Sequence, residues 1–249
     1  MRKQILLACV AGVLMGAPAV AADWKLVEGQ RNEALDKEVV RTVRLKFVLH
    51  LPRGIAEPGK TWPLILFLHG SGESGADVEK VKLHGPLKYA ASQPDFPFIV
   101  LAPQAPEAIG WNTSDVMALL DEALAKLPVD TSRIYLTGLS MGGYAAWQLA
   151  VEHPDRFAAV APVCGAGRPF TAWRLKHLPI WAFHGALDPV VPVQDDRNMV
   201  DAVKAQGGDV RLTVYPDTGH DAWTPSYANP DLYLWFLQHR LGAQTGPLR

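Results

Sequence analysis

Short apolar runs alternate with amphipathic stretches along most of this chain. The runs are long enough for strands, and the stretches between them repeat apolar residues at the 3.6-residue helical period. The strand-like runs are Pro63 to Leu68, Phe96 to Ala102, Arg133 to Leu139, Phe157 to Val163, Pro179 to Phe183 and Val210 to Tyr215. The helical stretches are Ser114 to Leu127, Met141 to His153, Gln194 to Gln206 and Pro230 to Leu241.

This alternation predicts an α/β fold, a mostly parallel twisted sheet flanked by helices, because continuous apolar strands need cover on both faces. Glu38 to Leu51 alternates apolar and charged residues instead, which predicts one or two exposed antiparallel edge strands. Only about fifteen residues separate the run ending at Val163 from the one starting at Pro179. That is too short for a helical lid, so we expect no lid domain.

The first 22 residues have the pattern of a secretory signal peptide. Arg2 and Lys3 precede an apolar stretch, and Ala19-Val20-Ala21 has the small residues of a cleavage site. An uncleaved membrane anchor is the alternative, but the apolar stretch is short for a span. We therefore expect residues 1–22 to be a signal peptide and residues 23–249 to form one catalytic domain. The mature protein would be periplasmic or extracellular, without stable membrane insertion.

Composition narrows the class of partner. Lys plus Arg number 24 and Asp plus Glu number 25, with no run of like charge, so no basic stripe for nucleic acid is present. Signal cleavage would remove Cys9 and leave Cys164 as the only thiol, which excludes an internal disulfide. We expect Cys164 to be a buried structural residue. The sequence does not fix the oligomeric state.

The segment Gly138-Leu139-Ser140-Met141-Gly142 joins a predicted strand to a predicted helix. This is the context of a Gly-x-Ser-x-Gly nucleophile elbow, in which glycines allow the strand and the helix to approach closely. Ser140 is then the candidate nucleophile. The alternative is a tight strand-to-helix turn without chemistry.

A serine nucleophile needs a base and a group that orients the base. Asp188 follows the strand Pro179 to Phe183, and His220 follows the strand Val210 to Tyr215. Both loops lie at carboxyl ends of parallel strands, where such sheets bind ligands. Ser140, Asp188 and His220 are therefore the predicted catalytic triad.

Other acids and histidines compete for these roles. Asp217 and Asp221 flank His220 in sequence, and we expect them to point elsewhere, while Asp195 and Asp196 resemble the start of a helix. We interpret the remaining histidines outside the glycine-rich loop as surface or turn residues: His50, His84, His153, His177, His184 and His239.

A tetrahedral intermediate needs hydrogen-bond donors for its oxyanion. The backbone N–H of Met141 is the first candidate, and that of Ser71, in the loop His69 to Gly75, is the second. Glu73 either orders this loop or is a solvated turn residue. Gly70, Gly72 and Gly75 also match a dinucleotide-binding fingerprint, but no clean helical pattern opens at Gly75.

Two tryptophans follow strands of the predicted catalytic edge. Trp111 and Trp223 are candidate substrate-binding residues that would form apolar walls, with ordinary packing as the alternative. We expect no metal and no cofactor.

These segments resemble the α/β-hydrolase superfamily, and more closely its secreted carboxylesterases of the predicted-peptidase group, related to feruloyl esterases and polyester depolymerases. The likeness is carried by Leu68 to Gly75, Ala102 to Glu107 with Trp111, the Ser140 elbow, the Asp188 loop, and Gly219 to Trp223 with Tyr227. The resemblance implies hydrolysis of carboxylic esters through an acyl-serine intermediate.

The expected function is therefore a serine carboxylesterase acting on short-chain, aryl or polymer-linked esters. The resemblance does not select the acid or the alcohol. A secreted serine peptidase of the same fold is the first alternative. A noncatalytic or nucleotide-binding protein that uses the loop from Gly70 to Gly75 is the second.

Overall fold

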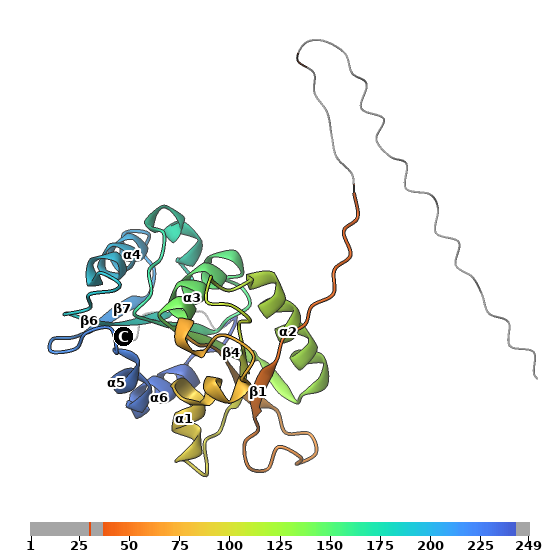
Figure 1. Cartoon of the computed structure of the whole chain (residues 1–249). Helices are drawn as coiled ribbons and strands as arrows, with labels where there is room; N and C mark the ends of the chain where they lie inside the picture. Colours follow the sequence, from red (N-terminus) through yellow and green to blue (C-terminus); the bar gives the residue numbers. More distant parts are fainter. Residues whose placement is uncertain (1–29, 31–36, 243–249) are drawn as a thin grey trace, which may run out of the picture. The chain divides into compact units, whose positions relative to one another are not determined.

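The computed structural model describes residue 30 and residues 37–242. The chain divides into two units, Met1–Thr42 and Val43–Arg249, and every described strand and helix lies in the second (Figure 1). The signal peptide expected over residues 1–22 lies outside the described residues. Within the described part of the chain, no helix has the length and apolar character to cross a membrane.

The unit Val43–Arg249 is built on a seven-stranded sheet of order β1-β3-β2-β4-β5-β6-β7. Strand β1 pairs antiparallel with β3, and all other pairs are parallel. The strands are β1 Phe47–His50, β2 Trp62–Leu68, β3 Ile99–Pro103, β4 Val129–Leu139, β5 Ala159–Val163, β6 Ile180–Gly185 and β7 Val210–Tyr215.

Helices cover both faces of this sheet (Figure 1). One face packs against α2 Thr113–Lys126, α3 Met141–Glu152 and α4 Val193–Ala205. The other packs against α1 Gly85–Ala91, α5 Trp223–Ala228 and α6 Pro230–Gln238. Three short 3-10 helices, η1 Ser71–Glu73, η2 Val78–Lys82 and η3 Pro169–Leu175, lie in the connections.

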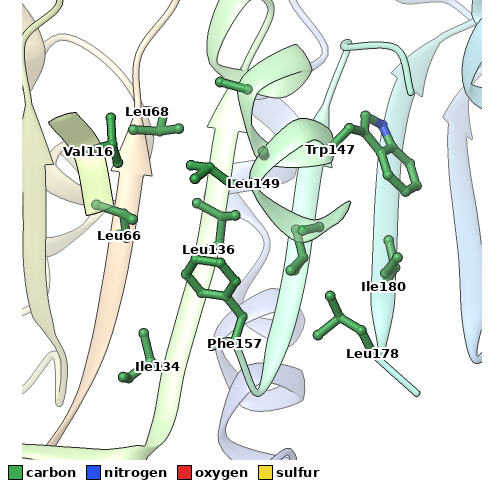
Figure 2. Close-up of a cluster of buried hydrophobic side chains, with 14 of the residues drawn as sticks. Leu66, Leu68, Val116, Ile134, Leu136, Trp147, Leu149, Phe157, Leu178 and Ile180 are labelled. Carbon is green, nitrogen blue, oxygen red and sulfur yellow. The ribbon is translucent and has the colours of Figure 1, made fainter. Parts of the chain in front are cut away.

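Strand β2 shows how the sequence produces two cores. Leu64, Leu66 and Leu68 belong to the cluster under α2, α3 and α4, whereas Ile65 and Phe67 belong to the cluster under α1, α5 and α6. Successive side chains of a strand point to opposite faces, so a strand covered twice must be apolar at every position. Figure 2 shows the first cluster, where helix α3 lies over the central strands.

The fold class is confirmed, and its differences from the sequence prediction are local. The segment Glu38 to Leu51 contains a single strand, Phe47–His50, because only those residues pair with β3. Helices α1 and α5 were not predicted, since each is shorter than the window in which a helical period is recognisable. Between β5 and β6 the described chain forms only η3, so no lid domain lies at this position.

Candidate active site

The nucleophile elbow joins β4 to α3. Ser140 has φ of 51° and ψ of −115°, a strained backbone conformation for a residue with a side chain. A Cβ on Gly138 would lie 2.3 Å from the Gly142 carbonyl oxygen, and a Cβ on Gly142 would lie 2.0 Å from the Leu68 carbonyl oxygen. Both glycines are therefore required for the helix to approach β2 and β4 and for the serine to stand at the sheet's edge.

The three side chains predicted to act together form one hydrogen-bonded chain. Ser140 Oγ lies 2.9 Å from His220 Nε2, and His220 Nδ1 lies 2.7 Å from Asp188 Oδ2. Because a carboxylate only accepts, Nδ1 donates to Asp188, and Nε2 of the neutral ring is left to accept the serine proton. This is the arrangement of a nucleophile, a base and an orienting acid.

The loops after β6 and β7 lie close enough to bring Asp188 to His220. A Cβ on Gly185 would lie 2.0 Å from the Gly219 carbonyl oxygen, so only glycine fits where these loops meet. The Leu187 N–H also donates to the Thr218 carbonyl at 3.0 Å. Backbone contacts thus fix the spacing of the acid and the base.

Asp188 is wholly buried, whereas the His220 side chain is 20% exposed. Burial raises the pKa of Asp188, but hydrogen bonds from His220 and from the Val191 and Val190 N–H groups outweigh it, so the pKa is lowered. Those two N–H groups donate to Asp188 Oδ1 at 2.9 and 2.8 Å. The acid is therefore held ionised, with Oδ2 left for His220.

The competing acids near His220 lie elsewhere. Asp221 accepts hydrogen bonds from the N–H and the hydroxyl of Thr224 at the start of α5, and Asp217 is exposed. Neither carboxylate makes a hydrogen bond to His220 within the described structure, in which Asp188 fills that position.

The predicted oxyanion donors open two helices. Met141 is the first residue of α3 and Ser71 the first of η1, where backbone N–H groups lack partners within the helix. Both residues line the same cleft as Ser140. Glu73 orders the loop, because its buried carboxylate accepts the Gly70 N–H at 3.0 Å.

Buried His69, whose role the sequence did not reveal, completes this support. Its Nε2 accepts the Ala105 N–H at 3.0 Å, and its Nδ1 lies 2.6 Å from the Gly70 carbonyl oxygen. Burial lowers the pKa of His69, more than the contacts with Gly70 and Glu73 raise it, so the ring is neutral with its proton on Nδ1. The loop that carries Ser71 is thus tied to the segment after β3.

An open cleft of about 550 Å³ lies beside Ser140. Trp111 lines it, as the sequence suggested, and donates its indole N–H to the His69 carbonyl at 3.2 Å. Ile109 and Val190 also line the cleft and are 88% and 64% exposed. Their exposed apolar surface suits an apolar or aromatic substrate group.

Trp223 packs against His220. Its ring meets the His220 ring edge-on, with centroids 5.3 Å apart, and meets the His84 ring at 5.7 Å. It lines a separate hollow of about 300 Å³ together with Lys88 and Tyr227. The two tryptophans predicted as one pair of walls thus belong to two different hollows.

One histidine was interpreted wrongly from the sequence. His184 is not a surface or turn residue but a wholly buried residue of β6. Asp196 lies in the first turn of α4, as predicted, and its buried carboxylate faces this histidine. His184 Nδ1 lies 2.7 Å from Asp196 Oδ2. The sequence predicts that this strand ends at Phe183, which places His184 in the following turn, whereas β6 continues to Gly185.

The glycine-rich loop does not have the form of a dinucleotide site. After Gly70 the chain forms the three-residue 3-10 helix η1, and no α-helix opens at Gly75. A pyrophosphate site of that type needs the N-terminus of a helix directly after the loop. No group of three or more potential metal ligands occurs among residues 37–242 and residue 30.

Known proteins similar to this chain share its fold. The profile described as "Dienelactone hydrolase family" matches residues 103–230, the range that contains Ser140, Asp188 and His220. The chain is 32% identical to "Putative esterase NocK" of Nocardia uniformis subsp. tsuyamanensis over 71% of its own length and 56% of the relative's.

Two further comparisons cover similar parts of the chain. It is 27% identical to the poly(3-hydroxyoctanoate) depolymerase of Pseudomonas fluorescens, over 78% of this chain and 80% of that protein. A solved structure titled "Crystal Structure of a Thermostable Esterase" has a TM-score of 0.70 and 32% identity, covering 79% of this chain and 59% of that one. The chain thus spans little more than half the length of NocK and of this structure.

Proposed function

Because the chain belongs to the dienelactone hydrolase family of α/β-hydrolases, we propose that it is a serine carboxylesterase. The observation that carries the proposal is the unbroken hydrogen-bonded chain from Ser140 Oγ through His220 to Asp188, at the edge of an open cleft. A serine hydroxyl alone is a poor nucleophile, and this chain supplies the base that activates it.

In the proposed reaction, Ser140 Oγ attacks the ester carbonyl carbon while its proton passes to His220 Nε2. The carbonyl oxygen becomes an oxyanion, which accepts hydrogen bonds from the Met141 and Ser71 N–H groups. The intermediate then collapses, the bond to the alkoxy oxygen breaks, and the histidine gives its proton to the departing alcohol. Water repeats the sequence on the acyl-serine and releases the carboxylic acid.

The proposed substrates are short-chain, aryl or polymer-linked esters. The open cleft supports this range, because its apolar walls at Trp111, Ile109 and Val190 suit a flat or short apolar group. The similarity to a polyester depolymerase supports the polymer-linked class. Hydrolysis assays across acyl lengths, aryl esters, acetylated sugars and polyesters select among these, and equally fast cleavage of aminoacyl anilides would indicate a peptidase instead.

Ser140→Ala tests the mechanism directly. We expect hydrolysis of p-nitrophenyl acetate to fall by about 10⁴- to 10⁶-fold and labelling by a fluorophosphonate probe to disappear. Ser114→Ala makes the same chemical change at an exposed serine of α2 and should leave both unchanged. Wild-type turnover or labelling in Ser140→Ala would contradict the proposal.

Export is part of the same proposal and is supported by the basic start, the apolar stretch and Ala19-Val20-Ala21. N-terminal sequencing of the protein recovered from periplasm and culture medium is expected to begin directly after this site. An intact Met1 on the recovered protein would contradict it.

A further inference from the structure

A second histidine lies behind the acid of the triad. The His184 side chain is wholly buried beside Asp188, and its Nε2 lies 3.3 Å from Asp188 Oδ2. The same oxygen lies 2.7 Å from His220 Nδ1. Two imidazole rings therefore meet at one carboxylate oxygen, one ring partly exposed and the other wholly buried.

Both nitrogens of the His184 ring face hydrogen-bond acceptors. Nε2 lies 2.9 Å from the Val191 carbonyl oxygen, which cannot donate, so Nε2 carries a proton. Nδ1 lies 2.7 Å from Asp196 Oδ2. The Trp147 indole N–H donates to the other oxygen of Asp196 at 2.8 Å, which stabilises that carboxylate as an anion. An ionised Asp196 only accepts, so Nδ1 also carries a proton.

The surroundings act on both partners of this pair. Burial raises the pKa of Asp196, although the hydrogen bonds from His184 and Trp147 and the charge of His184 lower it. Burial lowers the pKa of His184, but the hydrogen bond and the charge of Asp196 outweigh it, so the pKa is raised. The resulting order of charges is Asp196 negative, His184 positive and Asp188 negative. Each buried charge thus has a partner of opposite sign.

The resting active site gives such a cation a role. In the proposed mechanism His220 must be neutral at Nε2 to accept the serine proton, so it gives Asp188 a hydrogen bond but no full positive charge. Burial raises the pKa of Asp188, and the hydrogen bonds that oppose burial gain a counter-charge when the neighbouring ring is a cation. His184 is wholly buried beside Asp188 and can supply that charge without occupying the cleft.

We propose that His184 is a positioning residue that is doubly protonated between Asp196 and Val191 and holds the Asp188 carboxylate ionised for His220. The inference rests on the proposed serine esterase function. The cation therefore extends activity to lower pH, where Asp188 would otherwise be protonated and could no longer accept the Nδ1 proton of His220.

The other titratable groups around this network belong to three further elements. Tyr144 comes from α3 and Cys164 follows β5, and burial first, then the neighbouring carboxylates, raises the pKa of each, so both are neutral. Asp195, in the first turn of α4, adds a negative charge that acts on Asp196 and Tyr144. The largest charges that act on His184 are those of Asp196 and Asp188.

The first test reads the charge directly in the wild-type protein. Nitrogen-15 NMR of the assigned His184 ring at pH 8 should show both ring nitrogens in the protonated imidazolium range. An unprotonated nitrogen at that pH would overturn the proposal. This readout involves no ester, so it holds whether or not the proposed function does.

The second test separates charge from shape. In Asp196→Asn the amide donates to His184 Nδ1, which makes the ring neutral but leaves the Nε2 proton toward Asp188. We expect the acidic limb of the pH profile of kcat/KM to move to higher pH by about 1 unit, with the plateau nearly unchanged. His184→Gln removes the ring as well and should show the same shift with a lower plateau.

His177→Gln is the matched control, because it makes the same change at an exposed histidine. Its profile should equal that of the wild type, and all profiles are measured where circular dichroism shows the protein folded. An acidic limb that stays in place in Asp196→Asn, or in His184→Gln if the first variant does not fold, overturns the proposal. Absence of esterase activity in the wild type would instead contradict the proposed function.

Discussion

The molecule contains two histidine–aspartate pairs with the same spacing and opposite roles. In both, Nδ1 of the ring lies 2.7 Å from an aspartate Oδ2: His220 with Asp188, and His184 with Asp196. They differ in what the second ring nitrogen meets. For His220 it is the Ser140 hydroxyl, which can give up a proton, and for His184 it is the Val191 carbonyl, which cannot.

Burial follows the same division. The His220 side chain is 20% exposed, whereas that of His184 has no exposed surface. A base must exchange its proton with substrate and solvent, but a buried cation between two acceptors has no route for exchange. The comparison teaches that the partner of the second ring nitrogen, not the carboxylate, separates the histidine proposed as the base from the histidine proposed as a buried cation.

Asp188→Asn makes the largest change to this comparison, because Asp188 touches both rings. The asparagine amide donates to His220 Nδ1, which moves the ring proton to Nε2, where it blocks acceptance of the serine proton. We expect kcat/KM for p-nitrophenyl acetate to fall by about 10⁴-fold, the size of this effect in a serine protease triad. Stopped-flow and steady-state assays at several pH values measure it.

Asp217→Asn is the matched control, an exposed aspartate in the same loop as His220. It should retain wild-type kcat/KM. If Asp188→Asn kept more than about a hundredth of the activity, the orienting role of Asp188 would be wrong. The proposed functional difference between the two histidine–aspartate pairs would then have no support.

The fold and the triad could be predicted because each rests on a local pattern. Apolar runs on both faces identify covered strands, and parallel strands bring their carboxyl ends to one edge. Ser140, Asp188 and His220 each follow such a strand, so chain order alone predicts that they meet. Gly138 and Gly142 of the elbow are also recognisable in the sequence, because a residue with a Cβ would clash where the helix approaches the strands.

The support of the triad could not be predicted in the same way. His184 lies inside an apolar strand and Asp196 in the first turn of a polar-looking helix, and nothing local indicates that they face each other. Their contact depends on how α4 packs on β6, which is a property of the tertiary structure. The same holds for His69, whose partner Ala105 follows a different strand.

Trp147→Phe sharpens the comparison by weakening only the buried pair. It removes the indole donor to Asp196 Oδ1 and leaves a smaller aromatic ring in the core, a change of volume that the Trp181→Phe control shares. A hydrogen bond to a charged group contributes about 1.5 to 3 kcal/mol, so we expect the free energy of unfolding to fall by about that amount. Urea denaturation followed by circular dichroism measures it, and kcat at the pH plateau should change far less.

Trp181→Phe is the control for this variant, because the Trp181 indole donates to the neutral hydroxyl of Thr213 at 2.9 Å and phenylalanine keeps an aromatic ring against the Arg211 guanidinium. Its loss should be smaller, about 0.5 to 1.5 kcal/mol, as for a neutral hydrogen bond. Equal losses in the two variants would indicate that Asp196 carries no charge, and the two pairs would then differ less than their contacts suggest.

The smallest expected effect is the pH dependence of stability that the buried pair contributes. In the folded protein, burial lowers the pKa of His184, but the hydrogen bond and the charge of the Asp196 carboxylate outweigh burial, so the pKa is raised. Its contribution is therefore fully present below the unfolded value of about 6.5 and is lost as the pH rises through the folded value. The difference in unfolding free energy between wild type and Asp196→Asn should shrink from pH 6 to pH 9 in urea titrations. A difference that grows over this window would mean that the pKa of His184 is lowered in the folded protein, so that a neutral ring lies beside an ionised Asp196, the arrangement proposed for His220 and Asp188.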